Sequence, residues 1–194
     1  MIPDTPDKPT RAGDIQRLVN WVGETEYANL KLGNRLDPVV TPFMPWQPAD
    51  FLGIMWDVMG EASGPVFIDV GCGPGTKMRI AAELLALEPF GVEIDVDMAK
   101  AAKAWGHVYK GDALNLTSIY ARADIIWLYR PFRDAAREAR LEQLIIAQMK
   151  PGAILAGGSW ETDIPSLGWQ PVVDDCIISP DGKAQIWRGA WKKL

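Results

Sequence analysis

Short runs of mainly apolar residues alternate with helix-forming stretches through the middle of the chain. The runs are VFIDVG (66–71), FGVEID (90–95), HVYKGD (107–112), ADIIWLY (123–129) and GAILAGG (152–158). The stretches between them, at about 76–87, 96–105 and 133–149, predict helices. Strands that are buried on both faces are nearly all apolar, and strand–helix alternation is typical of a parallel sheet between two layers of helices. The pattern therefore predicts an α/β domain.

The last part of the chain has a different pattern. Two β-rich runs, 169–179 and 183–191, flank the tetrapeptide Ser-Pro-Asp-Gly at 179–182. Proline followed by Asp-Gly favours a tight turn because proline presets φ and glycine tolerates positive φ. We therefore expect a Rossmann-like, mostly parallel sheet of seven strands that ends in an antiparallel hairpin, with helices on both faces.

The first part of the chain predicts an arm and a helical cap. Residues 1–12 are rich in proline and poor in apolar residues, which favours a disordered or loosely attached arm. Residues 13–32 roughly fit a helical stripe, the proline-rich stretch 36–50 favours an extended chain, and a second helix is expected at about 49–61. We expect 1–62 to be the arm and cap, and 63–194 to be one structural unit.

Composition narrows the class of protein. With 194 residues the chain has the length of one domain with one core. Its net charge of −5 argues against tight, non-specific binding of nucleic acid as the main activity. Cys72 and Cys176 form no Cys-x-x-Cys pair, and one histidine completes no zinc site. No signal peptide and no apolar run of about 20 residues is evident, so we expect a reduced, cytoplasmic protein without a membrane segment or a metal.

A glycine-rich loop joins the first strand of the pattern to the first helix. It reads Asp-Val-Gly-Cys-Gly-Pro-Gly-Thr from Asp69 to Thr76. Glycines at such a turn let the backbone approach a ligand, and the start of the helix favours a negative group. The dinucleotide fingerprint G-x-G-x-x-G needs glycine at position 76, where threonine stands. The alternative is a tight turn without a ligand.

Two more acidic residues follow strands. Glu93 closes the second strand, where a carboxylate can accept hydrogen bonds from both ribose hydroxyls of a nucleoside; the alternative is a solvated loop acid. Asp112 follows the third strand, where it can accept from the exocyclic amine of adenine or cap the next short helix.

In this order and spacing, the three motifs resemble those of the class I S-adenosylmethionine-dependent methyltransferases, over residues of about 62–158, and the terminal hairpin resembles the reversed last strand of that family. The resemblance implies S-adenosylmethionine as cofactor and methyl transfer as activity. It assigns Asp69, Gly71, Gly73 and Gly75 to the methionine part, Glu93 to the ribose, and Asp112 with Ala113 to the adenine. Two further residues would line the cofactor: Cys72, as a space-filling residue rather than a nucleophile, and Ile94 as an apolar contact.

The segment Thr-Pro-Phe-Met-Pro-Trp at 41–46 resembles segments that close over the cofactor in several of these enzymes. The alternative is an ordinary linker whose aromatic residues pack on the core.

The fourth strand ends in Tyr129-Arg130-Pro131-Phe132, near the place where the resemblance puts the methyl acceptor. Relatives that methylate exocyclic amines carry Asn/Asp-Pro-Pro-aromatic there, and Arg130 replaces the accepting residue. Arg130 could bind an anionic acceptor or be a surface arginine, and Tyr129 could line the pocket or pack in the core. Glu161, after the fifth strand, is a candidate base or a solvated loop acid.

The acceptor is open at this stage: a small molecule or a protein side chain. Two other functions compete with methyl transfer. A nucleotide-binding oxidoreductase is disfavoured by Thr76 and by the hairpin, and a non-catalytic module that binds the cofactor would have the same motifs.

Overall fold

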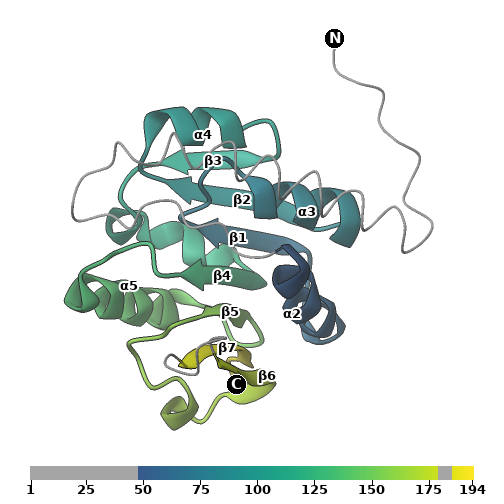
Figure 1. Ribbon diagram of the computed structural model, residues 1–194, viewed down its shortest axis with the longest axis vertical. Coiled ribbons are helices and arrows are strands. Elements are labelled where there is room, and N and C mark those ends of the chain that lie inside the picture. Colours follow the sequence, from purple (N-terminus) through teal and green to yellow (C-terminus); the bar gives the residue numbers. More distant parts are fainter. Residues whose placement is uncertain (1–47, 179–184) are drawn as a thin grey trace.

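The computed structural model describes residues 48–178 and 185–194 (Figure 1). The elements in chain order are α2 (Pro48–Glu61), β1 (Val66–Val70), α3 (Thr76–Leu85), β2 (Glu88–Glu93), α4 (Val96–Ala102), β3 (His107–Lys110), the 3-10 turns η1 (Ala113–Asn115) and η2 (Thr117–Arg122), β4 (Ile125–Tyr129), α5 (Ala135–Gln148), β5 (Ile154–Gly158), the 3-10 turn η3 (Pro165–Leu167), β6 (Gln170–Ile178) and β7 (Gln185–Lys192). The predictions for the arm, the first helix, the 41–46 segment and the Ser-Pro-Asp-Gly turn lie outside the described residues.

The seven strands form one sheet in the order β3-β2-β1-β4-β5-β7-β6. The first five strands pair in parallel, and β7 pairs antiparallel with both β5 and β6. The predicted fold, a mostly parallel sheet with an antiparallel C-terminal hairpin, is confirmed. The strand order changes direction at β1, which has β2 on one side and β4 on the other. Open α/β sheets bind ligands at the carboxyl ends of the strands at such a point.

The second strand begins earlier than its apolar run suggested. Glu88 pairs with Val66 of β1, and the strand ends at Glu93. Pro89 cannot donate a backbone hydrogen bond, so the sequence pattern placed the start of the strand after it. The parallel partner nevertheless extends the pairing through Pro89 to Glu88, whose N–H donates to the carbonyl of Pro65 at 2.8 Å.

Helices cover both faces of the sheet (Figure 1). On one face, Phe67 and Trp127 pack with Phe51 of α2 and with α3, and α4 extends this layer over β2 and β3. On the other face, Ile68 and Leu128 pack with α5 and with η2. Because side chains of a strand alternate between faces, β1 and β4 supply both cores, which explains their nearly continuous apolar sequences.

No helix in residues 48–178 or 185–194 is long and apolar enough to cross a bilayer.

Candidate functional site

The glycine loop follows β1 at the carboxyl edge of the sheet. Gly71, Gly73 and Gly75 have φ of +76°, +54° and +88°, conformations that cost little only for glycine. At Gly75 any side chain is also excluded by lack of space, because a Cβ atom there would lie 2.8 Å from the Cα of Ala102. The third glycine therefore lets α4 pack against the loop, whatever the loop binds.

The loop uses most of its amide hydrogens inside the protein. The N–H groups of Gly71 and Cys72 donate to the carbonyl of Val92, and that of Gly75 donates to the carbonyl of Cys72, at 2.9–3.0 Å. Gly73 donates to a carboxylate oxygen of Glu93 at 2.8 Å, and Pro74 has no N–H. Hydrogen bonds thus hold the backbone of the loop in place. Within the loop and the helix that follows it, donors for a negative group are left only at the start of α3.

Cys72 fills space between the glycine loop and the sheet. Its side chain is buried against the sheet, and its thiol is 3.6 Å from the carbonyl of Gly73. Burial, together with the negative charges of Asp69 and Glu93, raises the pKa of the Cys72 thiol. A raised pKa disfavours the thiolate, which agrees with a packing role rather than a nucleophilic one.

Glu93 is fixed at the end of β2 by the backbone of two loops. One carboxylate oxygen accepts from Gly73 N and the other from Asp95 N, both at 2.8 Å, and the residue is only 7% exposed. Burial raises the pKa of Glu93, against these two hydrogen bonds, which lower it. The backbone thus fixes the carboxylate of Glu93 at the carboxyl end of β2, beside the glycine loop. The structure brings Glu93 and the glycine loop into direct contact. The assignment of Glu93 to a ribose stays a prediction.

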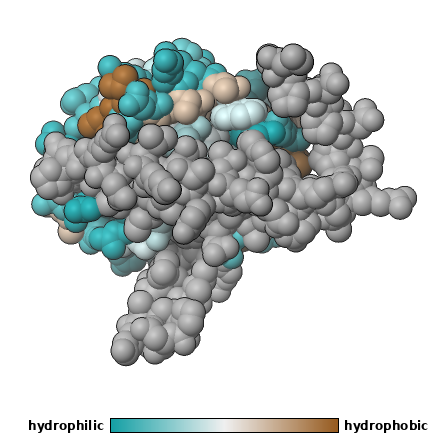
Figure 2. All heavy atoms as spheres, turned by 45° about the horizontal axis from the view of Figure 1, so that its top comes forward, coloured by the Kyte–Doolittle hydropathy of each residue, from teal (hydrophilic) through white to brown (hydrophobic). Residues whose placement is uncertain are grey.

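Apolar side chains beside Glu93 are open to solvent. Ile94 is 40% exposed and Val96 is 57% exposed, on the turn from β2 into α4. In the space-filling view that brings the α4 side forward, a few hydrophobic residues lie together among mainly hydrophilic residues of the coloured surface (Figure 2). Exposed aliphatic residues next to a fixed carboxylate suit a ligand with a flat apolar part and a hydroxylated part, such as a nucleoside.

Asp69 is buried at the base of the loop and is 1% exposed. Its Oδ2 atom has no hydrogen-bond partner in the part of the chain that the structure describes. Burial raises the pKa of Asp69 to about 6, and the positive charge of buried Lys77 limits the rise. A buried carboxylate oxygen without a donor is costly, which makes it a candidate for contact with a ligand donor.

Asp112 does two things after β3. Its Oδ1 accepts from Leu114 N at 3.0 Å, which caps η1, and its Oδ2 forms an ion pair of 2.9 Å with Arg137 of α5. The capping alternative is thus observed, and it leaves acceptor positions on both oxygens. The neighbouring Ala113 is buried, and its carbonyl accepts from the hydroxyl of Tyr120 at 2.9 Å.

The three residues expected near the acceptor lie at the ends of β4 and β5. Arg130 adopts φ +40°, and its Nη2 atom is 3.5 Å from Oε1 of Glu161. Both side chains are partly open to solvent. Tyr129 is half-buried and packs against the core on the α2 and α3 face. The structure therefore brings Arg130 and Glu161 together. Tyr129 packs against the core, and its role in lining a pocket stays a prediction.

Two buried glutamates of α5 hold the backbone of the segments that follow β4 and β5. Glu138 accepts from Phe132 N at 3.0 Å, and Glu142 accepts from Glu161 N at 2.9 Å and Thr162 N at 2.6 Å. Both are at most 1% exposed. Burial raises the pKa of Glu138 to about 7 despite the hydrogen bond from Phe132. These two glutamates and Arg137 were missed by the sequence analysis, because on an Ala- and Arg-rich helix they look like ordinary surface charges. Lys77 was missed in the same way, at the start of α3.

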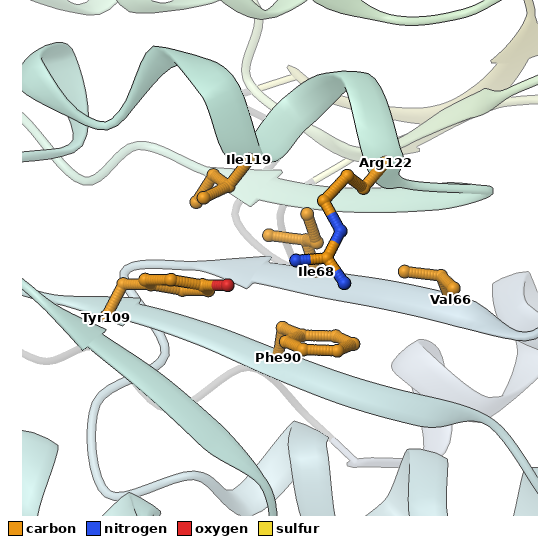
Figure 3. A pocket seen from close by; sticks show the side chains of 6 residues that line it. All are labelled: Val66, Ile68, Phe90, Tyr109, Ile119 and Arg122. Carbon is orange, nitrogen blue, oxygen red and sulfur yellow. The ribbon is translucent and has the colours of Figure 1, made fainter.

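A separate hollow of about 180 Å³ lies on the α5 and η2 face (Figure 3). It is lined by Val66, Ile68, Phe90, Tyr109, Ile119 and Arg122. The Arg122 guanidinium lies over the ring of Phe90, 5.6 Å from its centroid. The hollow faces the middle of β1 and β2 rather than their carboxyl ends. It is not part of the candidate site.

The fold has close counterparts among solved structures. An RNA methyltransferase from Salinibacter ruber in complex with S-adenosyl-L-homocysteine is 20% identical, with a TM-score of 0.58 over 77% of this chain and 93% of that chain. The N-methyltransferase NodS from Bradyrhizobium japonicum WM9, also with S-adenosyl-L-homocysteine, is 14% identical, with a TM-score of 0.61 over 87% and 98%. TrmN from Thermus thermophilus is 16% identical, with a TM-score of 0.57 over 77% of this chain and 49% of that chain.

This chain has the class I methyltransferase fold. No family model matches the sequence, and no curated protein is similar to it in sequence. The likeness is therefore one of architecture, and the chemistry has to be argued from the site.

Proposed function

We propose that the protein is an S-adenosylmethionine-dependent methyltransferase that acts on a small molecule or a protein side chain. The observation that carries the proposal is the contact between Glu93 and Gly73. It joins the turn after β1 to the end of β2, and so places the carboxylate of Glu93 beside the glycine loop at the carboxyl edge of the sheet.

The same loop disfavours a dinucleotide. Binding of a pyrophosphate at a glycine loop needs backbone N–H groups that point at the phosphates. In this loop the N–H groups of Gly71, Cys72, Gly73 and Gly75 are all used inside the protein. The antiparallel β7 also departs from the all-parallel sheet of dinucleotide-binding domains. Since donors are left only at the start of α3, a cofactor that brings one small anionic group, such as a carboxylate, fits the site better than a pyrophosphate.

The described residues fit S-adenosylmethionine at three points. The methionine part carries an ammonium group, which matches the buried and unsatisfied Oδ2 of Asp69. The ribose hydroxyls match the fixed carboxylate of Glu93, and the exocyclic amine of adenine matches Asp112. The exposed Ile94 lies between the ribose and adenine residues in the chain and would contact the base.

When bound, the cofactor would supply a methyl group on a sulfonium centre; a nucleophile attacks the methyl carbon, and the thioether is the leaving group. The protein then has to align the acceptor and exclude water. Arg130 and Glu161 lie where the methyl acceptor would enter. Together they offer it a hydrogen-bond donor and a hydrogen-bond acceptor. Glu161 would receive a proton or orient the nucleophile, and Arg130 would hold Glu161 in place.

The test is calorimetry with S-adenosylmethionine and S-adenosylhomocysteine on the folded protein. We expect micromolar dissociation constants for both. A folded protein that binds neither compound contradicts the proposal. Binding to both without transfer to any acceptor in a broad panel of small molecules and peptides would instead indicate a non-catalytic binding module.

A further inference from the structure

The carboxylate of Asp112 is held by two donors from different parts of the chain. Leu114 N donates to Oδ1 at 3.0 Å, within the same loop, and Arg137 donates to Oδ2 at 2.9 Å from the first turn of α5. The two donors together fix the plane of the carboxylate. The side chain remains 25% exposed, so a ligand can still reach it.

Arg137 is itself held in place. Its backbone N–H is capped by the carboxylate of Asp134 at 2.8 Å, at the start of α5. Its guanidinium carbon lies 4.5 Å from the ring centroid of Phe132, which is only 4% exposed. A guanidinium on an aromatic face loses little freedom when it donates to a carboxylate, because the planar group is already oriented. The ion pair therefore joins the β3 loop to α5 and to the β4 loop.

A fixed carboxylate distinguishes bases by their exocyclic groups. An ionised carboxylate only accepts hydrogen bonds, so it can pair with the 6-amino group of adenine. A 6-oxo purine would bring an acceptor to the same place, and two acceptors face each other unfavourably. The discrimination depends on the carboxylate staying in one orientation, since a mobile side chain can turn away.

We propose that Arg137 is a positioning residue that fixes Asp112 and thereby makes the nucleobase end of the site prefer a 6-amino purine to a 6-oxo purine. This inference rests on the proposed function, because it assigns the nucleobase end of that same site. Arg137, from α5, would act on the base through Asp112 without contacting the base itself.

The experiment compares two ligands that differ only in the base, S-adenosylhomocysteine and S-inosylhomocysteine, by calorimetry. The wild-type protein is expected to bind the adenosyl compound about tenfold or more tightly, as for a hydrogen bond to a charged group. Arg137→Met keeps an apolar side chain over Phe132 and removes the charge. It is expected to reduce this preference at least about threefold, mainly by weakening the adenosyl compound.

Three further variants separate positioning from general support. Arg137→Lys is expected to restore part of the preference, because the ammonium can still reach the carboxylate. Arg133→Met, which changes an exposed arginine just before α5, should leave the preference unchanged. In the Asp112→Asn background, adding Arg137→Met should have no further effect on the preference, because the amide has already replaced the carboxylate that Arg137 holds.

The outcomes are distinct. A folded Arg137→Met protein with an unchanged preference overturns the inference, and so does an equal loss for both ligands, which would mean that Arg137 only supports the fold. Thermal melting of each variant establishes folding. A wild-type protein that binds neither ligand overturns the proposed function itself, and the inference falls with it.

Discussion

Arg130 and Glu161 face each other across the ends of two neighbouring parallel strands, with Nη2 and Oε1 3.5 Å apart. The sequence offered Arg130 as a site for an anionic acceptor, and the structure gives this guanidinium an acidic neighbour. Glu161 is in turn held through its backbone by Glu142. An acceptor at this edge therefore meets a pair of opposite charges rather than an isolated arginine.

For Arg130→Ala we expect nearly unchanged affinity for S-adenosylhomocysteine and a reduced rate of transfer once an acceptor is known. Calorimetry and a transfer assay measure the two quantities. Because Arg130 has φ +40°, Arg130→Gly should be more stable than Arg130→Ala by about 1 kcal/mol, as measured by urea denaturation. Loss of cofactor binding in a folded Arg130→Ala protein would place Arg130 in the cofactor site instead.

Glu93→Ala should weaken S-adenosylhomocysteine binding by roughly 1.5–3 kcal/mol, the range for hydrogen bonds to a charged acceptor. The matched control is Glu88→Ala, at the other, exposed end of the same strand, which should leave the affinity unchanged. Calorimetry measures both. Equal affinities for the Glu93 variant and the wild type would mean that the ribose is held elsewhere.

Asp69 should release protons when the cofactor binds. Its pKa is raised to about 6 by burial, so near pH 6 about half of the protein carries a neutral Asp69. A ligand ammonium favours the ionised form and lowers this pKa, so affinity should rise as pH rises from about 5 to 7. Calorimetry at pH 6 in buffers of different ionisation enthalpy measures the release. Asp69→Asn should abolish the release, and a wild-type protein that takes up protons would contradict the contact.

Ionisation of Glu138 should lower the free energy of unfolding as pH rises. Its pKa is about 7 in the folded protein, above the ordinary value of 4.5, so the folded state binds the proton more tightly than the unfolded state. Its contribution is then fully present below about pH 4.5 and is lost as pH rises through about 7, on the order of 3 kcal/mol in total. Glu138→Gln stays neutral and lacks this loss.

The difference in free energy of unfolding between Glu138→Gln and the wild type should therefore shift in favour of the variant from pH 5 to pH 8. Urea denaturation at the two pH values measures it, and the subtraction cancels Asp69, whose raised pKa acts in the same direction in both proteins. Parallel pH profiles for the two proteins would show that Glu138 titrates as an ordinary carboxyl.

Duplex DNA of random sequence should not bind tightly. The net charge is −5, and two arginines, Arg130 and Arg137, are paired with carboxylates. Few phosphate contacts can then form, and affinity for DNA depends on such contacts. Fluorescence anisotropy at several salt concentrations measures the binding. A submicromolar affinity that falls steeply with salt would refute this expectation.

The sequence by itself determined the sheet and the glycine loop at its carboxyl edge. Apolar runs define strands because burial on both faces requires them, as Phe67 and Ile68 illustrate by packing on opposite sides of β1. The spacing of Gly71, Gly73 and Gly75 determined the loop, since positive φ is nearly closed to other residues. These are local constraints, and a linear pattern records them.

Only the tertiary structure decided which charges act together. Asp112 pairs with Arg137 over 25 positions, and Glu142 holds the backbone of Glu161 over 19. In the sequence these α5 residues resemble the solvated face of a surface helix. The burial of Glu142 and the pairing of Arg137 follow from how α5 packs on the sheet beside the loops after β3, β4 and β5. The energy of a charged side chain depends on partners that folding brings from elsewhere in the chain, and no local pattern encodes those partners.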